Sequence, residues 1–501
     1  MRKMRNLKLL LLTASLCSLI AAQVSTGRVL TPSAARVQLP PPRLSHDIPP
    51  EVEFGAGVTS PETARPFFDY FSWQSFVALN WPSAVGADGR PVRGVPNTGA
   101  GVGDAGKRVW ESYKADWELF RPGGAEPTAW SSYDLNPRAT AENPCGNVGD
   151  SKMLAMITKM DSVIDGINQA FSGPLIDQSR NYVRYEIHVN KAYYEKVADP
   201  NVKWYLFDRQ SRDPNRPNVF PDGVIEIKAA WKELVEGRDD PNRYYTVDAL
   251  IVEPGTPRVC RPARMGLVGF HIANKVVHLR EWVWSTFEHV DNVPEGAPVP
   301  GDKYSFNNGT ATPASPNGFD HRPAKLSDAE PLPQPNDPRR EPVQVTRFTP
   351  VSPAGQVTPT TDEINAQWQQ ALSGTIWRFY KLVSTQWPTV SDGASFKVKR
   401  SSIQPGSSGV FPQDSGLPFP AENVANVTME TYFQKGQSCM RCHYNASQDD
   451  FSFLLSERAF RPSPPLPLSM NVAERLRRIT EDRMSRSPTL RNLRDEVQRQ
   501  Q

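Results

Sequence analysis

The sequence of 501 residues lacks any strong surplus of charge, because its 57 Lys and Arg stand against 54 Asp and Glu. So small a net charge gives no basic surface of the kind that binds nucleic acids. The sequence also contains no complete Gly-rich phosphate loop, no His-Glu-x-x-His helix motif and no Gly-x-Ser-x-Gly elbow. Nucleotide binding and the hydrolase classes that use these motifs therefore have no residues to support them.

Long apolar runs are missing after the N-terminus. Residues 1–22 have a basic head, an apolar run from Leu7 to Ile20 and the small pair Ala21-Ala22, which is the layout of a secretory signal peptide. The run is shorter than the roughly 18 residues expected of a membrane span, and a retained anchor is the alternative. We expect export to the periplasm and no integral membrane span after cleavage. The mature chain then has 57 − 4 = 53 basic and 54 acidic residues, a net charge of −1.

Cysteine is scarce, with five in the sequence. Removal of Cys17 with the signal peptide leaves Cys439 and Cys442, which belong to one short motif, and Cys145 and Cys260, which do not. In an exported protein, Cys145 and Cys260 are expected to pair as a disulfide. The alternative is that both stay reduced in separate sites, because sequence alone does not place them within bridging distance.

Aromatic residues are plentiful, and 12 Trp, 22 Phe and 14 Tyr suffice for a large core. Apolar residues at helical spacing predict helices over residues 61–82, 107–123, 151–171 and 361–388. Alternation of apolar and polar residues predicts strands over residues 181–189, 223–231, 244–253, 266–275 and 276–290. Few helices of crossover length separate these strands, so we expect an α+β fold with an antiparallel sheet and aromatic-rich helices.

Composition divides the rest of the chain into segments. Proline accounts for 48 residues, which indicates long irregular connections over the body. The C-terminal part that follows the longest Pro-rich region is expected to be mainly helical. The expected segments are a signal peptide at 1–22, an extended lead-in at 23–60, an α+β body at 61–295, a Pro-rich loop or linker at 296–360, a helical segment at 361–470 and a charged tail at 471–501.

The segment Cys439-Met440-Arg441-Cys442-His443 places two residues between its cysteines and a histidine directly after the second. This spacing suits the addition of two thiols to the two vinyl groups of haem, and it is the pattern of c-type haem attachment. The segment resembles the haem-binding motif of c-type cytochromes, with the resemblance limited to about residues 430–459. The resemblance implies one covalent haem c, with Cys439 and Cys442 as thioether attachments and His443 as the proximal iron ligand.

Other sites also use a Cys-x-x-Cys pair. A thioredoxin-like dithiol should open a helix directly after a strand, and "METYFQKGQ" before the motif has no strand pattern. A structural disulfide between Cys439 and Cys442 is a related alternative. A zinc site would need a second pair of ligands at matching spacing. The export signal favours haem, because in the family that the motif resembles attachment takes place outside the cytoplasm.

The second axial ligand of the iron decides what a haem at this site can do. Met470 follows a Pro-rich stretch downstream of the motif and is the nearest candidate. His271 and His289, near expected strand ends in the body, are weaker alternatives, and an open position is another. Two strong ligands restrict iron to electron exchange, whereas an open position lets it bind O₂ or peroxide.

Charged residues interrupt several apolar strands of the body, as in Glu186 and His188 and in Glu226 and Lys228. If their strands face one another, we expect these two pairs to converge on a polar pocket, because buried pairs of this kind often mark functional sites. The alternative is the ordinary solvated face of an antiparallel sheet.

The sequence therefore predicts an exported monohaem c-type cytochrome that transfers single electrons in the periplasm, with an unidentified redox partner protein. The enzyme alternative is a haem-dependent periplasmic oxidoreductase with a substrate pocket in the β-rich body. A third alternative is a secreted binding or sensing protein that uses the haem segment as a module.

Overall fold

The computed structural model describes most of the expected body and parts of the C-terminal segment, all within one compact unit that begins at Arg36. The expected signal peptide, Met470 and the charged tail lie outside the described residues. Among the residues that are described, no helix is both long and apolar enough to cross a bilayer. The described residues are 36–133, 145, 151–154, 173–206, 219–253, 259–277, 282–295, 303–309, 318–323, 337–353, 355–387, 425–435, 438–444, 446 and 449–459.

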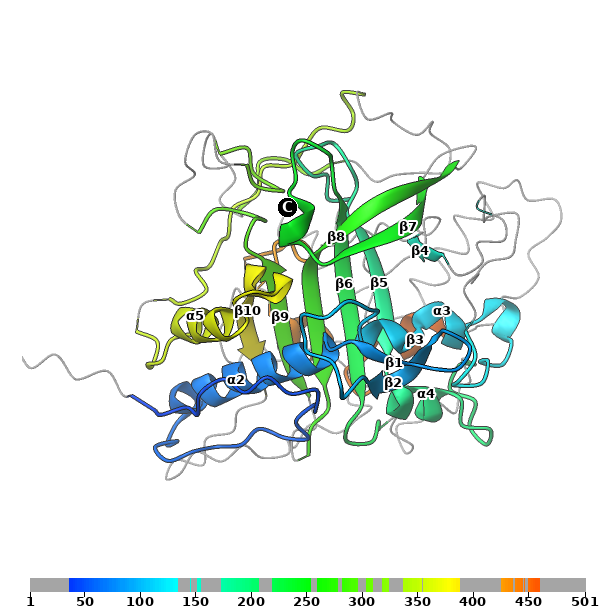
Figure 1. Cartoon of the computed structure of the whole chain (residues 1–501), viewed down its shortest axis with the longest axis horizontal. Helices are drawn as coiled ribbons and strands as arrows, with labels where there is room; N and C mark the ends of the chain where they lie inside the picture. Colours follow the sequence, from blue (N-terminus) through cyan, green and yellow to red (C-terminus); the bar gives the residue numbers. More distant parts are fainter. Residues whose placement is uncertain are drawn as a thin grey trace, which may run out of the picture. The chain divides into compact units, whose positions relative to one another are not determined.

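An eight-stranded sheet organises the fold (Figure 1). Six strands follow the order β10-β9-β8-β6-β5-β3, while β7 pairs with β8 and β4 pairs with β7. Every pairing is antiparallel except that of β4 with β7. The expected α+β class with a mainly antiparallel sheet is confirmed. The strands of this sheet are β3 (Lys114–Ala115), β4 (Lys152–Leu154), β5 (Arg184–Val189), β6 (Ile225–Glu233), β7 (Thr246–Glu253), β8 (Val259–Asn274), β9 (Val283–His289) and β10 (Tyr380–Gln386); β1 (Ser83–Val85) and β2 (Pro91–Pro96) form a separate pair.

The described helices are mostly short. The two longest, α2 (Pro61–Leu79) and α5 (Thr361–Ala371), each begin with a capping box, in which the N-cap side chains of Ser60 and Thr360 accept from the backbone three residues on. The other helical elements are α3 (Asp116–Leu119), α4 (Lys191–Val197), α6 (Cys439–Tyr444), α7 (Phe453–Arg458) and the 3₁₀ turns η1 (Trp110–Ser112), η2 (Pro122–Gly124), η5 (Pro241–Arg243) and η6 (Ile376–Phe379).

Two expected helices near the start of the body are wrong or only partly described. The aromatic stripe of residues 107–123 is divided among η1, β3 and α3, because Lys114 and Ala115 pair with Val189 and His188 at the edge of the sheet. The expected helix 151–171 begins instead as strand β4, which runs parallel to β7. The remainder of that segment lies outside the described residues.

The expected helix over residues 361–388 is also wrong in its second half. Helix α5 ends at Ala371, and Gly374 follows in the left-handed region at a φ of 91°. The chain then passes through η6 into β10, which is buried along its whole length and pairs with β9. The sheet therefore includes a strand from beyond residue 295. The last expected strand, 276–290, is shorter than predicted, since β9 begins at Val283.

Different parts of the chain cover the two faces of the sheet. Helices α2 and α5 pack on one face, where the ring centroid of Phe76 lies 4.3 Å from that of Phe287 and 5.8 Å from that of Phe270. The described residues 425–435 and 438–444 pack on the other face, and Gly269 of β8 allows their close approach, because a Cβ there would collide with Thr428. The motif of Cys439–His443 and the aromatic core thus lie on opposite sides of one sheet.

Candidate functional site

Helix α6 carries the Cys-x-x-Cys-His motif. Cys439, Cys442 and His443 are three and four residues apart, so one helical turn places them on the same side of the helix. Both cysteines are half-buried thiols, and His443 is buried. The Met440 N–H donates to Gln386 Oε1 at 3.1 Å, which attaches the helix to the end of β10. The motif is therefore held against the sheet by hydrogen bonding as well as by packing.

The motif side chains face a small cavity against the sheet. The ring centroid of His443 lies 3.9 Å from that of Trp284, which forms one wall. The cavity volume is about 20 Å³, which is room for a single water molecule. Its lining consists of motif side chains and residues of the sheet and of the preceding segment: Glu226, Lys228, His271, Ile272, Ala273, Trp284, Ser285, Glu430, Ser438, Cys439, Cys442 and His443.

The imidazole of His443 is oriented by a backbone carbonyl. Its Nδ1 lies 2.7 Å from the carbonyl oxygen of Phe451. A carbonyl oxygen only accepts, so Nδ1 carries the proton and, in the neutral ring, the lone pair lies on Nε2. Metal-binding histidines generally donate their second ring N–H to such an acceptor. The structure thus holds His443 in the tautomer that a metal ligand at Nε2 requires.

The Phe451 carbonyl is presented by an unusual turn. Asp450 and Phe451 have φ values of 51° and 69°, in the left-handed region that non-glycine residues seldom adopt. The Phe451 N–H donates to Ala446 O at 2.9 Å, which closes the turn. Such conformations persist where the surroundings enforce them, and they are frequent at functional sites.

Two buried contacts fasten this turn to the body. The carboxylate of Asp450 pairs with the ammonium of Lys275, and both side chains are buried. Ser452 Oγ donates to Glu226 Oε2 at 2.8 Å and lies 2.7 Å from the Tyr193 hydroxyl. Glu226 belongs to β6 and lines the cavity, so the turn that orients His443 is connected directly to the sheet under the motif.

His271, one of the expected distal ligands, lines the same cavity as the motif. It lies on β8 opposite Lys228 of β6 and Thr286 of β9, on the sheet face where Asn426 and the motif also pack. Its Nε2 is 3.6 Å from Glu430 Oε2. The structure therefore brings together His271 and the three motif residues, which are about 170 positions apart in the sequence. Met470 lies outside the described residues.

His289, the other expected ligand, lies away from the motif. It follows Trp284 by five residues on β9, a separation of roughly 16 Å along a strand, and the odd spacing places it on the opposite face. Its ring is fully buried and stacks on Tyr244 with centroids 4.0 Å apart. Nε2 lies 2.9 Å from Arg243 O, and Nδ1 accepts from the Asp291 N–H at 3.1 Å. These contacts assign His289 a structural role.

Burial of His289 predicts a loss of stability in mild acid. Burial lowers the pKa of His289 from 6.5 to about 4, so between these values the unfolded chain binds a proton that the folded protein does not. Stability from this group is complete above pH 6.5 and falls by about 3 kcal/mol as the pH drops toward 4. Urea unfolding of His289→Gln should show a flatter pH profile across this window. The control Lys191→Gln, at an exposed lysine of α4, should leave the profile unchanged; equal profiles for His289→Gln and wild type would contradict the assignment.

Cys145 and Cys260 form a disulfide, the pairing expected from the sequence. Their sequence separation is 115 residues, and Cys260 belongs to the outer part of β8, where that strand pairs with β7. Among the described residues, no group of three or more His, Cys, Asp or Glu side chains is arranged to hold a bare metal ion.

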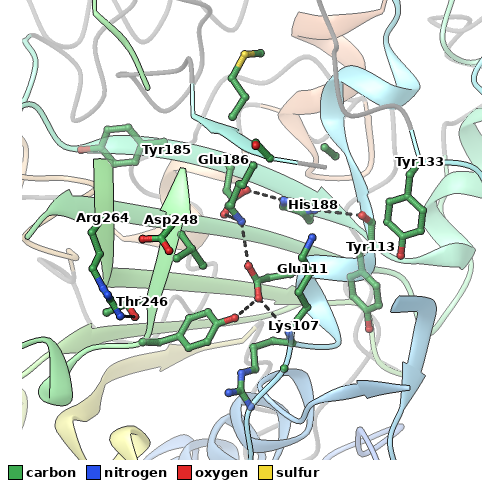
Figure 2. Close-up of a pocket in the computed structure, with 18 of the residues that line it drawn as sticks. Lys107, Glu111, Tyr113, Tyr133, Tyr185, Glu186, His188, Thr246, Asp248 and Arg264 are labelled. Carbon is green, nitrogen blue, oxygen red and sulfur yellow. Dashed lines mark hydrogen bonds and ion pairs between the residues drawn. The ribbon is translucent and has the colours of Figure 1, made fainter. Parts of the chain in front are cut away.

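A larger cavity, of about 730 Å³, is built around β5 and the segments beside it (Figure 2). Glu186 and His188 of β5 face it, and their neighbours in register on β6 are Ala229 and Ile227. Glu226 and Lys228 alternate with these β6 residues and line the motif cavity instead. The expectation that the two charged pairs converge on one pocket is therefore wrong, because the register of β5 and β6 directs them to opposite faces.

A network of buried charges forms the floor of the larger cavity (Figure 2). Lys152 Nζ donates to Glu186 Oε1 at 2.8 Å and to Glu111 Oε1 at 3.1 Å. His188 Nε2 lies 2.8 Å from Glu186 Oε2. The Tyr245 hydroxyl donates to Glu111 through a short hydrogen bond. The network joins β4, β5, η1 and Tyr245, which directly precedes β7, so four separate segments position its side chains.

The charges of this network are fixed near neutral pH. Burial alone would raise the pKa of Glu186, but Lys152 and His188 outweigh burial and lower it to about 2. In Glu111, burial is likewise outweighed, chiefly by Lys152, so its pKa is lowered. Burial disfavours the ammonium of Lys152, but the two carboxylates raise its pKa. Lys152 therefore stays protonated, and it serves as a fixed positive charge and not as an amine nucleophile.

Comparison with known proteins gave no relative on which to base a function. No family model matches the chain, and no match was found among curated proteins or solved structures. The function has to be inferred from the two cavities and from the residues that line them.

Proposed function

We propose that the protein is an exported monohaem c-type cytochrome that transfers single electrons in the periplasm. The observation that supports this best is the setting of His443, which directly follows Cys442 in the motif and donates Nδ1–H to the Phe451 carbonyl. The motif spacing is that of c-type haem attachment. The hydrogen bond is the one that a histidine uses when its Nε2 binds a metal.

Each residue of the site has a distinct role in this proposal. A bound haem supplies one-electron redox chemistry, tuned by its axial ligands and surroundings. Cys439 and Cys442 hold the porphyrin through thioethers, and His443 presents Nε2 to the iron. The Phe451 carbonyl keeps the ring in the correct tautomer and increases its basicity. Trp284 packs on the imidazole at 3.9 Å and limits its rotation.

Two thiols and an imidazole, from Cys439, Cys442 and His443, are the donors that a c-type haem requires. The space among the described side chains limits when such a group could be attached. The cavity at the motif measures about 20 Å³, far less than a porphyrin occupies. The side chains between α6 and the sheet must therefore separate around the group. We infer that attachment precedes the final docking of α6 and the Asp450 turn on the sheet.

His271 is the described candidate for the second axial ligand. It lines the motif cavity, whereas His289 lies on the opposite face of the sheet. His271 Nε2 now lies 3.6 Å from Glu430 Oε2, so a bond from this nitrogen to iron would replace that contact. Met470 remains the alternative ligand from the segment that follows the motif.

Export is supported by the N-terminal sequence and by the disulfide. The basic and apolar pattern of residues 1–22 is that of a signal peptide, and disulfides such as Cys145–Cys260 persist in oxidising compartments. Together they favour the periplasm, where c-type haem attachment would follow translocation. A redox partner protein there would exchange electrons with the haem.

The larger cavity favours a second candidate function, that of a haem-dependent periplasmic oxidoreductase. Its volume of about 730 Å³ lies within the range of small-molecule sites. Glu186 and His188 on β5 face this cavity and pair in register with Ala229 and Ile227 of β6. The β6 residues that alternate with these, Glu226 and Lys228, face the motif cavity. A substrate in the larger cavity would thus be separated from the motif by the thickness of one sheet.

The test is a pyridine haemochrome spectrum of the protein matured in a periplasm. Wild type should give a c-type band with one haem per chain, and Cys439→Ala with Cys442→Ala should lose all of it. The matched control, Cys145→Ser with Cys260→Ser, removes the other two mature cysteines and should keep the haem. Wild type without the band, or a motif variant that retains it, would overturn the proposal. A motif disulfide without haem would indicate the dithiol alternative.

A further inference from the structure

The larger cavity has more positive groups than its own acids neutralise. Its lining contains six Lys and Arg and five Asp and Glu. Most of the acids already have partners: Glu111 and Glu186 bind Lys152, Glu118 binds Arg93 at 2.5 Å, and Asp116 binds Arg458 at 3.4 Å. Three cations of the lining, Lys107, Arg108 and Arg264, have no ion pair with any described residue.

Arg108 is the most unusual of these cations, because its side chain is only 4% exposed. Its guanidinium donates to the carbonyls of Asn80 and Val102, both at 3.3 Å, and its Nε makes no hydrogen bond to a described residue. It stacks over the Tyr245 ring at 5.0 Å. A buried guanidinium without a carboxylate is costly, and an anion bound nearby would offset that cost.

The loop before Arg108 adds backbone donors to the same wall. The segment "GVGDAGKR" runs from Gly101 to Arg108, and its last four residues line the cavity. The amide nitrogens of Gly106 and Lys107 donate to no described group. Gly106 has a φ of 133°, a backbone conformation that residues other than glycine rarely adopt. Exposed backbone N–H groups in such loops bind anions.

The remaining cations lie where a ligand could reach them. Lys107 is exposed beside Glu111, and Arg264 is exposed beside Thr246 and Asp248 on the strand side of the cavity (Figure 2). Asp248 is the one lining acid without an ion pair to a described cation, so three unpaired cations lie around one unpaired carboxylate. The walls between them are largely aromatic, and they include Tyr113, Trp117, Tyr133, Tyr244 and Tyr245.

We propose that this cavity binds a small organic anion, a carboxylate or phosphate attached to an apolar or aromatic body. The oxyanion contacts Lys107 and the Gly-rich loop, with Arg108 and Arg264 supplying the field around it, and the body packs against the tyrosine walls. Cavities of this size generally combine apolar walls with a few such polar contacts. The binding does not depend on haem, since the motif lies on the other face of the sheet.

Isothermal titration calorimetry of the full exported protein tests the proposal with benzoate, phenyl phosphate and the neutral analogue benzamide. At least one anion should bind, roughly tenfold or more tightly than benzamide. Lys107→Gln combined with Arg264→Gln should raise the dissociation constant of that anion by roughly tenfold or more. Because both side chains are exposed, the double variant should fold as wild type does. Lys191→Gln, at an exposed lysine of α4, is the matched control and should bind as wild type does.

The outcomes separate this proposal from that of the haem. Anion binding that persists in Cys439→Ala with Cys442→Ala supports the cavity whether or not haem is found. Absence of binding for both anions, benzamide binding as tightly as they do, or an unchanged affinity in the double variant would each overturn it. A preference between benzoate and phenyl phosphate identifies which oxyanion the loop accepts.

Discussion

Asp450→Asn is expected to lower the free energy of unfolding by about 3–5 kcal/mol. Asp450 is fully buried, its carboxylate pairs with buried Lys275, and it also accepts from the Phe220 N–H at 2.7 Å. An amide at this position cannot neutralise the ammonium, which would then be buried without its counter-charge. The turn that presents the Phe451 carbonyl to His443 should loosen with it, because Asp450 fixes that turn to the body.

The midpoint of urea unfolding measures this effect. Lys191→Gln is the matched control, because its pair with Glu195 is 3.6 Å long and mostly exposed, and such surface pairs contribute less than about 1 kcal/mol. Lys275→Met combined with Asp450→Asn should recover most of the loss, because the double variant no longer buries an unpaired ammonium, and asparagine still accepts from the Phe220 N–H. If Asp450→Asn unfolds at the same urea concentration as Lys191→Gln, the buried pair does not anchor the turn.

Lys152→Met is expected to lower the free energy of unfolding by a similar amount, about 3–5 kcal/mol at neutral pH. Lys152 bridges the carboxylates of Glu111 and Glu186 at 3.1 and 2.8 Å. Methionine would occupy much of the volume of the lysine stem, but it would leave two ionised carboxylates close together in a buried site. Packing against Trp110 and Trp231, which flank Lys152 at 5.3 and 5.0 Å, would be largely retained.

The pH dependence distinguishes this electrostatic cost from a packing defect. In wild type the pKa of Glu186 is about 2, below its ordinary 4.5, so its contribution is complete above pH 4.5 and is lost as the pH falls toward 2. In Lys152→Met, burial and mutual repulsion should raise the pKa of both carboxylates. Protonation of either carboxylate then removes the repulsion between them in the variant. The difference in unfolding free energy between wild type and Lys152→Met should therefore become smaller as the pH falls from about 7 to 4. A gap of constant size in urea unfolding would instead indicate lost packing.

The motif could be found from the sequence because all of its information is local. Cys439, Cys442 and His443 lie within five residues, so their spacing alone specifies the chemistry. The partner that fixes His443 was not predictable in the same way. The Phe451 carbonyl is a backbone group, and its direction depends on two left-handed residues that no propensity favours.

The network in the larger cavity was missed because it is assembled from distant segments. Glu111 and Lys152 both lie within stretches with helical spacing, but Lys114 pairs with Val189 and Lys152 pairs with Ala249, so parts of both stretches belong to the sheet. Tertiary pairing thus overrode the local pattern. Glu186 and His188 were recognised as unusual, but the face they occupy depends on register with β6, which local sequence does not specify.

Strand β10 shows the same limit in a different form. Ile376, Phe379 and Val383 continue the helical spacing of α5, and that spacing predicted one long helix. In the structure a turn at Gly374 breaks the helix, and burial against β9 stabilises the extended conformation of Tyr380–Gln386. An apolar segment that is buried on both faces is compatible with a helix or a strand, and here pairing with β9 stabilises the strand.

Mass spectrometry of the exported protein, digested to release the peptide that contains Cys439 and Cys442, tests the central claim most directly. A single haem added covalently to that peptide, and to no peptide with Cys145 or Cys260, is the expected result. Recovery of the peptide at its unmodified mass, or with only a bond between its two sulfurs, from protein made where c-type haem maturation is active would contradict it.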